Sequence, residues 1–268
     1  MDVIDDPVVV VDSLVKQYEI PTYRTAGRHR KESVVALDQV NLVVRRGEAV
    51  GLLGVNGSGK STLLNLISGA ERPSAGRVLV NGKPQLLSVG AVLRDNLTGA
   101  QNAVLGLLAK GLSQSRAENE ARGIADFTDL GDAFNRPLDT YSSGMRARLK
   151  FGIATTGNKD ILLVDEALAT GDASFTQKAR ERMVQHLGGA GTLFLVSHRD
   201  QDIVDNCSRA VWIHQGRVIA DGEALEVTRK YRQWTYRIGH GRDEEAARLI
   251  EEATRTYVSP TIVYDSEC

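Results

Sequence analysis

The sequence has little that would place the protein outside a reducing compartment or inside a membrane. It contains only two cysteines, Cys207 and Cys268, which lie far apart and show neither metal-binding nor redox spacing, so a reducing compartment is favoured. A membrane-spanning helix needs about 20 consecutive apolar residues, and no stretch comes close. Residues 1–6 are acidic, so we expect no signal peptide. If the protein works at a membrane, we expect partner subunits to hold it there.

The sequence also lacks an excess of charge of one sign. Its 33 Lys and Arg residues are balanced by 34 Asp and Glu residues, which gives no electrostatic reason to expect nucleic acid as the partner. The hydrophobic share of 42% and the charged share of 25% are ordinary for a soluble globular chain. A length of 268 residues allows one large domain or two small ones.

A glycine-rich stretch carries the clearest chemical signal. It matches the phosphate-binding pattern G-x-x-x-x-G-K-[ST] and consists of Gly54, Val55, Asn56, Gly57, Ser58, Gly59, Lys60, Ser61 and Thr62. The preceding residues, 49–53, are apolar and predict a buried strand, and Leu63, Leu64 and Ile67 lie at helical spacing in residues 62–68. A strand, a glycine loop and a helix in this order are the context that the pattern requires, which disfavours a chance glycine turn.

The residue types of this loop explain its chemistry. Its glycines let backbone N–H groups converge on phosphate oxygens, and the helix N-terminus adds partial positive charge at the same place. We expect Lys60 to reach the β- and γ-phosphates and Ser61 to offer its hydroxyl to Mg²⁺.

Two acidic residues follow a second apolar stretch. Residues 161–164 predict a buried strand, and Asp165 and Glu166 end it in a Walker B pattern. The carboxyl ends of parallel strands face the ligand crevice, so we expect Asp165 to hold Mg²⁺ through water and Glu166 to polarise the attacking water. The alternative, two acids that cap a surface strand, is disfavoured because the strand is so apolar.

A histidine follows a third apolar stretch. Residues 192–196 predict a buried strand that ends at Ser197 and His198. From this position His198 could donate to a γ-phosphate. Taken alone, its position favours a helix-start histidine without a chemical role.

The remaining patterns predict an α/β fold with three parts. Strands at 8–18, 36–44 and 76–80 suit an antiparallel edge sheet beside a parallel nucleotide-binding core, and a hairpin follows at 210–219. From residue 90 to residue 159 the pattern becomes helical, with helices at 102–111 and 116–130. We therefore predict a nucleotide-binding domain over 1–225, a helical subdomain inserted at about 91–159, and a helical C-terminal extension over 226–268.

A basic segment interrupts the N-terminal strands. Arg28, His29, Arg30 and Lys31 lie in an exposed hairpin or loop between two predicted strands. The segment is either a solvated loop or a contact with an anionic membrane surface or lipid phosphate.

The order of these features resembles the nucleotide-binding subunit of an ABC transporter, from about Val8 to Tyr231. Within the helical region lies a serine–glycine signature, Tyr-Ser-Ser-Gly-Met at 141–145, and the apolar residues that recur every four positions from Met145 predict that a helix starts there. The signature departs from the common Leu-Ser-Gly-Gly-Gln at its first, third and fifth residues. This signature, the Arg-x-Arg-Leu-x-Phe that follows it and the segments 97–102 and 165–175 resemble the polysaccharide-exporter branch, which moves O-antigen, teichoic acid or galactan chains.

The resemblance implies further roles. ATP and Mg²⁺ would be the ligands, ATP hydrolysis the activity, and a second copy and a multi-span membrane permease the partners. Ser142, Ser143 and Gly144 would contact the γ-phosphate of ATP held by the opposite subunit, and residues 171–172 would cross the dimer. Tyr18 would stack on adenine, or would be a plain core or edge-strand aromatic. The glutamine expected before Leu97 is missing, so no coupling residue is assigned.

The resemblance favours an ATPase subunit that exports a lipid-linked polysaccharide from the cytoplasmic face of the membrane. The alternatives are an ABC subunit for another cargo, such as a lipid or drug, a non-transport ABC ATPase acting on ribosomes or DNA, and a P-loop kinase or GTPase. Beyond residue 224 the pattern is helical and acidic rather than that of a sugar-binding β-sandwich. We therefore expect the permease, not this subunit, to recognise the glycan.

Overall fold

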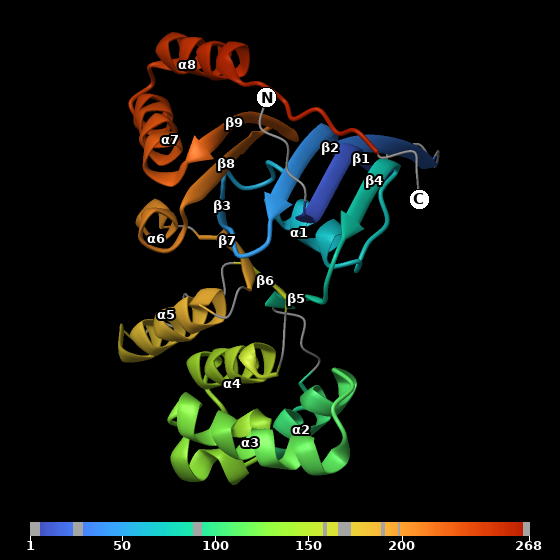
Figure 1. Cartoon of the computed structure of the whole chain (residues 1–268), viewed down its shortest axis with the longest axis vertical. Coiled ribbons are helices and arrows are strands. Elements are labelled where there is room, and N and C mark those ends of the chain that lie inside the picture. The colour runs from blue at the N-terminus through green and yellow to red at the C-terminus, as the bar shows by residue number, and fades with distance from the viewer. Residues whose placement is uncertain are drawn as a thin grey trace.

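The computed structural model describes residues 6–23, 29–87, 93–157, 160–165, 173–188, 191–197 and 199–264. These residues form two sheets and a set of helices (Figure 1). The smaller, three-stranded sheet is antiparallel and has the order β2-β1-β4, with β1 at Pro7–Tyr23, β2 at His29–Arg45 and β4 at Ala75–Val80. The larger, six-stranded sheet has the order β5-β6-β7-β3-β8-β9, with β3 at Ala49–Leu53, β5 at Pro84–Leu87, β6 at Ile161–Asp165, β7 at Thr192–Val196, β8 at Arg209–His214 and β9 at Arg217–Glu223. All neighbours in it are parallel except β8 and β9. This architecture confirms the predicted α/β class with an antiparallel edge sheet.

The central strands of the larger sheet are buried on both faces. In β7, Leu193 and Leu195 belong to one core cluster, while Phe194 and Val196 belong to the other. Successive side chains of a strand point to opposite faces, so an uninterrupted apolar strand can exist only where both faces are covered. This explains why the apolar stretches of the sequence predicted these strands correctly.

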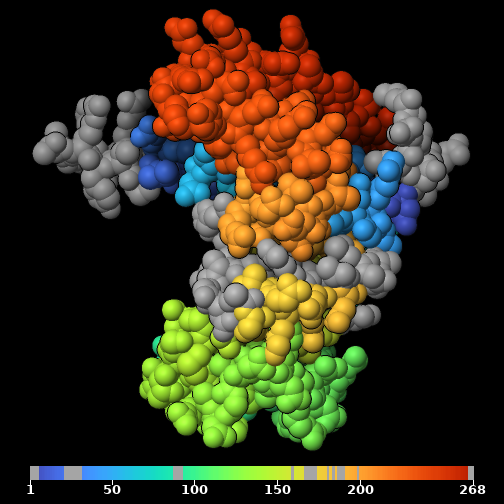
Figure 2. Space-filling model, turned by 90° about the vertical axis from the view of Figure 1, so that its left-hand side faces the viewer, coloured from blue at the N-terminus to red at the C-terminus, as the bar shows by residue number. Residues whose placement is uncertain are grey.

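Helices cover the two faces unequally. Helix α1, Lys60–Ile67, packs in the core between the two sheets. The opposite face is covered by α5 at Ala173–Gly188, α6 at Asp200–Asn206, α7 at Ala224–Gly239 and α8 at Asp243–Thr256. Figure 2 shows α7 and α8 at one end of the molecule and α5, in yellow, nearer its middle. Among the described residues, no helix combines the length and apolarity needed to cross a bilayer.

A helical arm forms the other end of the molecule (Figures 1 and 2). It contains α2 at Gly99–Ala109, α3 at Gln114–Thr128, short 3₁₀ turns at Gly131–Asn135 and Leu138–Thr140, and α4 at Ser143–Thr155. The arm has a core of its own, centred on residues such as Leu107, Leu138 and Leu149. Helix α2 begins where a capping box fixes it: Gln101 N donates to Thr98 Oγ1 at 3.1 Å, and Thr98 N donates to Gln101 Oε1 at 2.9 Å.

Two strand boundaries predicted from the sequence were wrong, and one strand was not predicted. The first strand does not end at Tyr18 but continues to Tyr23, and the second begins at His29 rather than at residue 36. The two strands pair along this whole length, so Ser33 lies opposite Glu19, and the polar composition there reflects exposure rather than a loop. The edge strand β5 was not predicted, because four residues that start with a proline give too short a signal. Arg28 lies outside the described residues, and the lipid contact of the basic segment stays a prediction.

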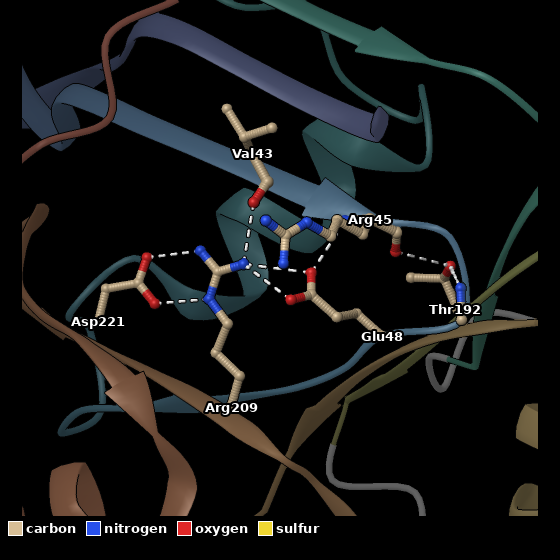
Figure 3. A network of polar contacts seen from close by, with 7 residues as sticks. Val43, Arg45, Glu48, Thr192, Arg209 and Asp221 are labelled. Atoms are coloured by element: carbon tan, nitrogen blue, oxygen red, sulfur yellow. Dashed lines mark hydrogen bonds and ion pairs between the residues drawn. The ribbon is translucent and has the colours of Figure 1, made fainter. Parts of the chain in front are cut away.

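An arginine joins the two sheets (Figure 3). Arg209 of β8 donates from Nε and Nη2 to the carboxylate of Asp221 at 2.6 and 2.7 Å. Its Nη1 donates to the carbonyl of Val43 in β2 at 2.9 Å and to Glu48 Oε2 at 3.2 Å. Glu48 in turn accepts from Arg45 N at 2.8 Å. Burial works to lower the pKa of Arg209, but its two carboxylate partners outweigh burial and raise the pKa, so the guanidinium stays charged.

This network generates a stability prediction. Arg209→Ala would leave two partly buried carboxylates without their cation, so we expect a loss of about 3 kcal/mol in the free energy of unfolding. Arg217→Ala is the matched control, since that side chain is 69% exposed in its pair with Asp38 and should cost less than about 1 kcal/mol. Urea unfolding followed by circular dichroism measures both, and equal losses would show that the Arg209 network stabilises the protein no more than an exposed ion pair does.

Candidate nucleotide-binding site

The glycine loop lies between the carboxyl end of β3 and the start of α1. Gly54, Gly57 and Gly59 have φ angles of 150°, 79° and 111°, a region that favours glycine. Space adds a second restriction, because a Cβ at Gly59 would lie 2.6 Å from the carbonyl oxygen of Ala36 and one at Gly54 would lie 2.4 Å from that of Ile213. The sequence therefore allows this loop to curl tightly where other residues would be strained.

Lys60 lies at the centre of the loop. It is the first residue of α1 and only 8% exposed. Its Nζ donates to the carbonyl oxygens of Gly54 at 2.7 Å and Val55 at 2.9 Å. The ammonium is thus held inside the curled loop at a helix N-terminus, which is where phosphate oxygens bind in such loops.

Two buried side-chain oxygens are suited to contact ligands: the carboxylate oxygen of Asp165 suits a cation, and the hydroxyl of Ser58 suits a phosphate. Asp165 Oδ1, at the carboxyl end of β6, and Ser58 Oγ, in the loop, are buried and have no hydrogen-bond partner within the described part of the chain. A buried polar atom without a partner costs about 1–3 kcal/mol, so these atoms suit a site that is completed by a ligand. Ser61, the other residue expected at Mg²⁺, is exposed in the first turn of α1.

A cavity of about 340 Å³ opens beside the loop. It is lined by Leu53, Gly54, Val55, Asn56, Lys60, Ser197, Asp200 and Tyr231. Sequence reasoning missed two of these residues. Asp200 stands two positions after the strand-end histidine and could have been noticed. Tyr231 carries no local signal, because only the packing of α7 brings it here.

Tyr231 belongs to an aromatic cluster next to the loop. Trp212 lies in β8 and is the register neighbour of Leu53 in β3, the residue before the loop. Its ring centroid is 5.5 Å from that of Tyr231 and 5.7 Å from that of Trp234. Burial, with a smaller effect of the nearby Asp200 charge, raises the pKa of Tyr231. Helix α7 therefore packs directly against the strand that supports the phosphate-binding loop.

The serine–glycine signature begins helix α4 in the arm. Met145 N donates to Ser142 Oγ at 3.2 Å, so Ser142 caps the helix, and both Ser142 and Ser143 are exposed. Tyr141 is buried behind them and donates to the carbonyl of Ala133 at 2.6 Å. Figure 1 shows α4 in the arm and α1 between the two sheets. The chain thus does not bring its own signature to its own phosphate loop.

The other candidate residues divide into two groups. Tyr18 is half-buried on β1 near α1 and donates to Glu71 Oε2 at 2.7 Å. Its stacking on adenine stays a prediction. The catalytic candidates Glu166 and His198 and the segment 171–172 lie outside the described residues.

A curled glycine loop with a buried lysine, placed between a parallel strand and a helix near a strand-end carboxylate, defines a P-loop protein of the kind that binds nucleoside triphosphates. Comparison with known proteins narrows this class. Residues 37–169 match the family model described as ABC transporter. The chain is also 35% identical over 235 residues to a teichoic acids export ATP-binding protein TagH from Staphylococcus haemolyticus, with 84% of this chain and 88% of the relative covered. The chain therefore belongs to the ABC transporter ATP-binding family.

Other relatives are longer than this chain. The protein of the same name from Enterococcus faecalis is 40% identical over 205 residues, which cover 76% of this chain and 46% of that relative. The Listeria innocua relative is 40% identical, with 75% of this chain and 60% of the relative covered. The chain thus spans about half the length of some curated relatives that it matches.

Solved structures agree on the fold. An ATP-binding cassette in a dimeric post-hydrolysis state with ADP and Pi aligns with a TM-score of 0.70 at 23% identity, covering 81% of this chain and 98% of the other. The structure of an ATP-binding subunit of an ABC transporter aligns with a TM-score of 0.69 at 25% identity, covering 84% of this chain and 93% of the other.

The aromatic cluster generates a spectroscopic prediction. Trp212 and Trp234 are the two tryptophans of the chain, and both pack against Tyr231 at the cavity beside the loop. Nucleotide binding should therefore change the intrinsic tryptophan emission in a saturable way. Lys60→Ala, which removes the cation of the loop, is the control and should abolish the response at the same nucleotide concentration. An emission spectrum that is unchanged by ATP at saturation would contradict this placement of the cluster.

Proposed function

We propose that this chain is the ATP-binding and ATP-hydrolysing subunit of an ABC transporter that exports a lipid-linked polysaccharide across the cytoplasmic membrane. The observation that carries the proposal is the curled loop that holds Lys60 between the carbonyls of Gly54 and Val55. The family of the chain supports the activity, and the names of its relatives support the cargo class. The chain would lie on the cytoplasmic face and be held there by its permease.

The proposed site uses the residues in distinct roles. Backbone N–H groups of residues 54–62 bind the triphosphate, and Lys60 neutralises its β- and γ-phosphates. Ser61 and Asp165 would hold Mg²⁺, which supplies charge neutralisation on the phosphates when bound. Glu166 would polarise the attacking water, and His198 would donate to the γ-phosphate.

We propose that the active form is a two-fold symmetric homodimer. The exposed serines of the signature lie at the mouth of α4, in the arm, where they cannot complete the chain's own loop. A second copy, arranged head to tail, would place its Ser142, Ser143 and Gly144 on the open side of the triphosphate, and residues 171–172 would cross between the copies. The arrangement gives two equivalent sites and is isologous.

The domain division follows the same proposal. Residues 1–225 would form the nucleotide-binding domain, with the helical subdomain at about 91–159 inserted in it. The extension over 226–268 would pack against that domain rather than form a separate unit. Helix α7 begins at Ala224, and its Trp234 is buried in the core beneath the larger sheet.

Hydrolysis and dimer formation can be tested with one variant. Glu166→Gln removes the negative charge that polarises water but keeps the side-chain volume, so we expect ATP binding to persist and turnover to fall at least about 100-fold. Because bound ATP would form much of the interface, this variant should be a dimer with ATP and Mg²⁺ and mainly a monomer without nucleotide, as measured by light scattering. Glu245→Gln on the exposed face of α8 is the control and should hydrolyse ATP at the parental rate. A Glu166→Gln variant with parental turnover would refute the assigned base.

The cargo class needs a test of its own. Purification of the tagged full chain from its own cells in mild detergent should recover a multi-span membrane protein, and loss of that complex should stop the appearance of the glycan at the cell surface while its lipid-linked precursor accumulates inside. Lys60→Ala, which should still bind the permease, must give the same accumulation. Normal surface glycan in cells that carry only Lys60→Ala would point to another cargo.

A further inference from the structure

The carboxylate of Glu71 accepts hydrogen bonds from side chains of the smaller sheet and of the P-loop helix. Its Oε2 accepts from the hydroxyl of Tyr18 at 2.7 Å and from Lys16 Nζ at 3.0 Å. Its Oε1 accepts from Asn65 Nδ2 at 3.0 Å. Tyr18 and Lys16 belong to β1, whereas Asn65 belongs to α1, the helix that begins at Lys60. One carboxylate thus ties a strand of the smaller sheet to the helix that carries the phosphate loop.

The ring of Tyr18 is held from more than one side. Lys16 Nζ lies 4.9 Å from the ring centroid and covers one face, in the geometry of a cation–π contact. Thr62, the last residue of the phosphate loop, interacts with the hydroxyl. The ring is therefore fixed within reach of the loop, and a base would stack on the face that Lys16 does not cover.

The protonation states favour one direction of the hydrogen bond. Burial raises the pKa of Tyr18, and Glu71 raises it further, so the hydroxyl stays a donor at neutral pH. Burial works to raise the pKa of Glu71 as well, but hydrogen bonds from Tyr18, Lys16 and Asn65 outweigh it and the pKa is lowered. Glu71 is therefore an ionised acceptor across the neutral range, and the bond is charge-assisted.

We propose that Glu71 is a positioning residue for the nucleotide base: its carboxylate fixes the ring of Tyr18 at one distance from the P-loop helix. The proposal rests on the proposed function, in which Tyr18 stacks on adenine. Tyr18 stands on a long strand whose next residues, Glu19 and Ile20, are exposed. Without a tether the ring would have to be ordered when the base binds, and that ordering lowers affinity.

The test compares ATP with inorganic tripolyphosphate, each as its Mg²⁺ complex, by calorimetric titration of the full chain. Both ligands engage the phosphate loop, but only ATP carries a base. Glu71→Ala should lower the affinity for ATP by about three- to tenfold, the size expected from one net hydrogen bond. It should leave the affinity for tripolyphosphate unchanged. Tyr18→Phe, which keeps the ring and removes the hydroxyl, should lower the affinity for ATP to a similar extent. Glu71→Gln should lower it less, because the amide keeps one acceptor oxygen.

A double variant separates positioning from simple support. If Glu71 acts through the hydroxyl of Tyr18, Glu71→Ala in the Tyr18→Phe background should add less than about twofold, because coupled residues are not additive. Glu245→Gln is the control, because it removes a carboxylate that is paired with Arg237 on the C-terminal helices. It should leave the affinities for both ligands unchanged.

The possible outcomes separate the inference on Glu71 from the proposed role of Tyr18. Equal weakening of ATP and tripolyphosphate by Glu71→Ala would show that Glu71 only supports the P-loop helix, and additive losses in the double variant would show that it acts independently of Tyr18. Either result overturns the inference and leaves the proposed function standing. If Tyr18→Ala leaves the ratio of the two affinities unchanged, Tyr18 does not contact the base, and that part of the proposed function fails together with the inference.

Discussion

The burial of the larger sheet on both faces is the constraint on which the site depends. A parallel strand with both faces covered cannot shift by one residue without moving its apolar side chains to the wrong core. Leu52 and Leu53 of β3 face different cores, so the point at which β3 ends is fixed, and with it the start of the phosphate loop. The same argument fixes Asp165, because Leu163 and Val164 of β6 are divided between the same two cores.

Parts far apart in the sequence meet around this fixed loop. The N-terminal strand β1 brings Tyr18 to the P-loop helix, where Glu71 holds it. The C-terminal helix α7 brings Tyr231 to the cavity beside the loop. The arm carries the signature serines away from the sheet (Figure 1). A base, a triphosphate and a second copy of the chain would thus each be met by a different part of the molecule.

The last described segment adds a further connection across the molecule. After α8 the chain crosses the smaller sheet (Figure 1), where Asn41 Nδ2 donates to Ser259 Oγ at 3.1 Å and Tyr264 donates to Asp12 Oδ2 at 2.8 Å. Arg77 lies over the ring of Tyr264 at 4.3 Å from its centroid. The segment therefore braces β1, β2 and β4 from outside, while Arg209 joins the sheets from within.

The sequence alone determined whatever depends on local pattern. Lys60 and its glycines form a recognisable loop because their conformation and chemistry are local, and Asp165 is recognisable because an uninterrupted apolar strand precedes it. The helix that begins after Ser142 was predicted for the same reason, since its cap is a local hydrogen bond. Only the tertiary structure decided the contacts between distant segments. It gave Tyr18 its partner Glu71 across 53 residues and brought Tyr231 to the loop, because such contacts depend on how helices and sheets pack and leave no period or spacing in the sequence.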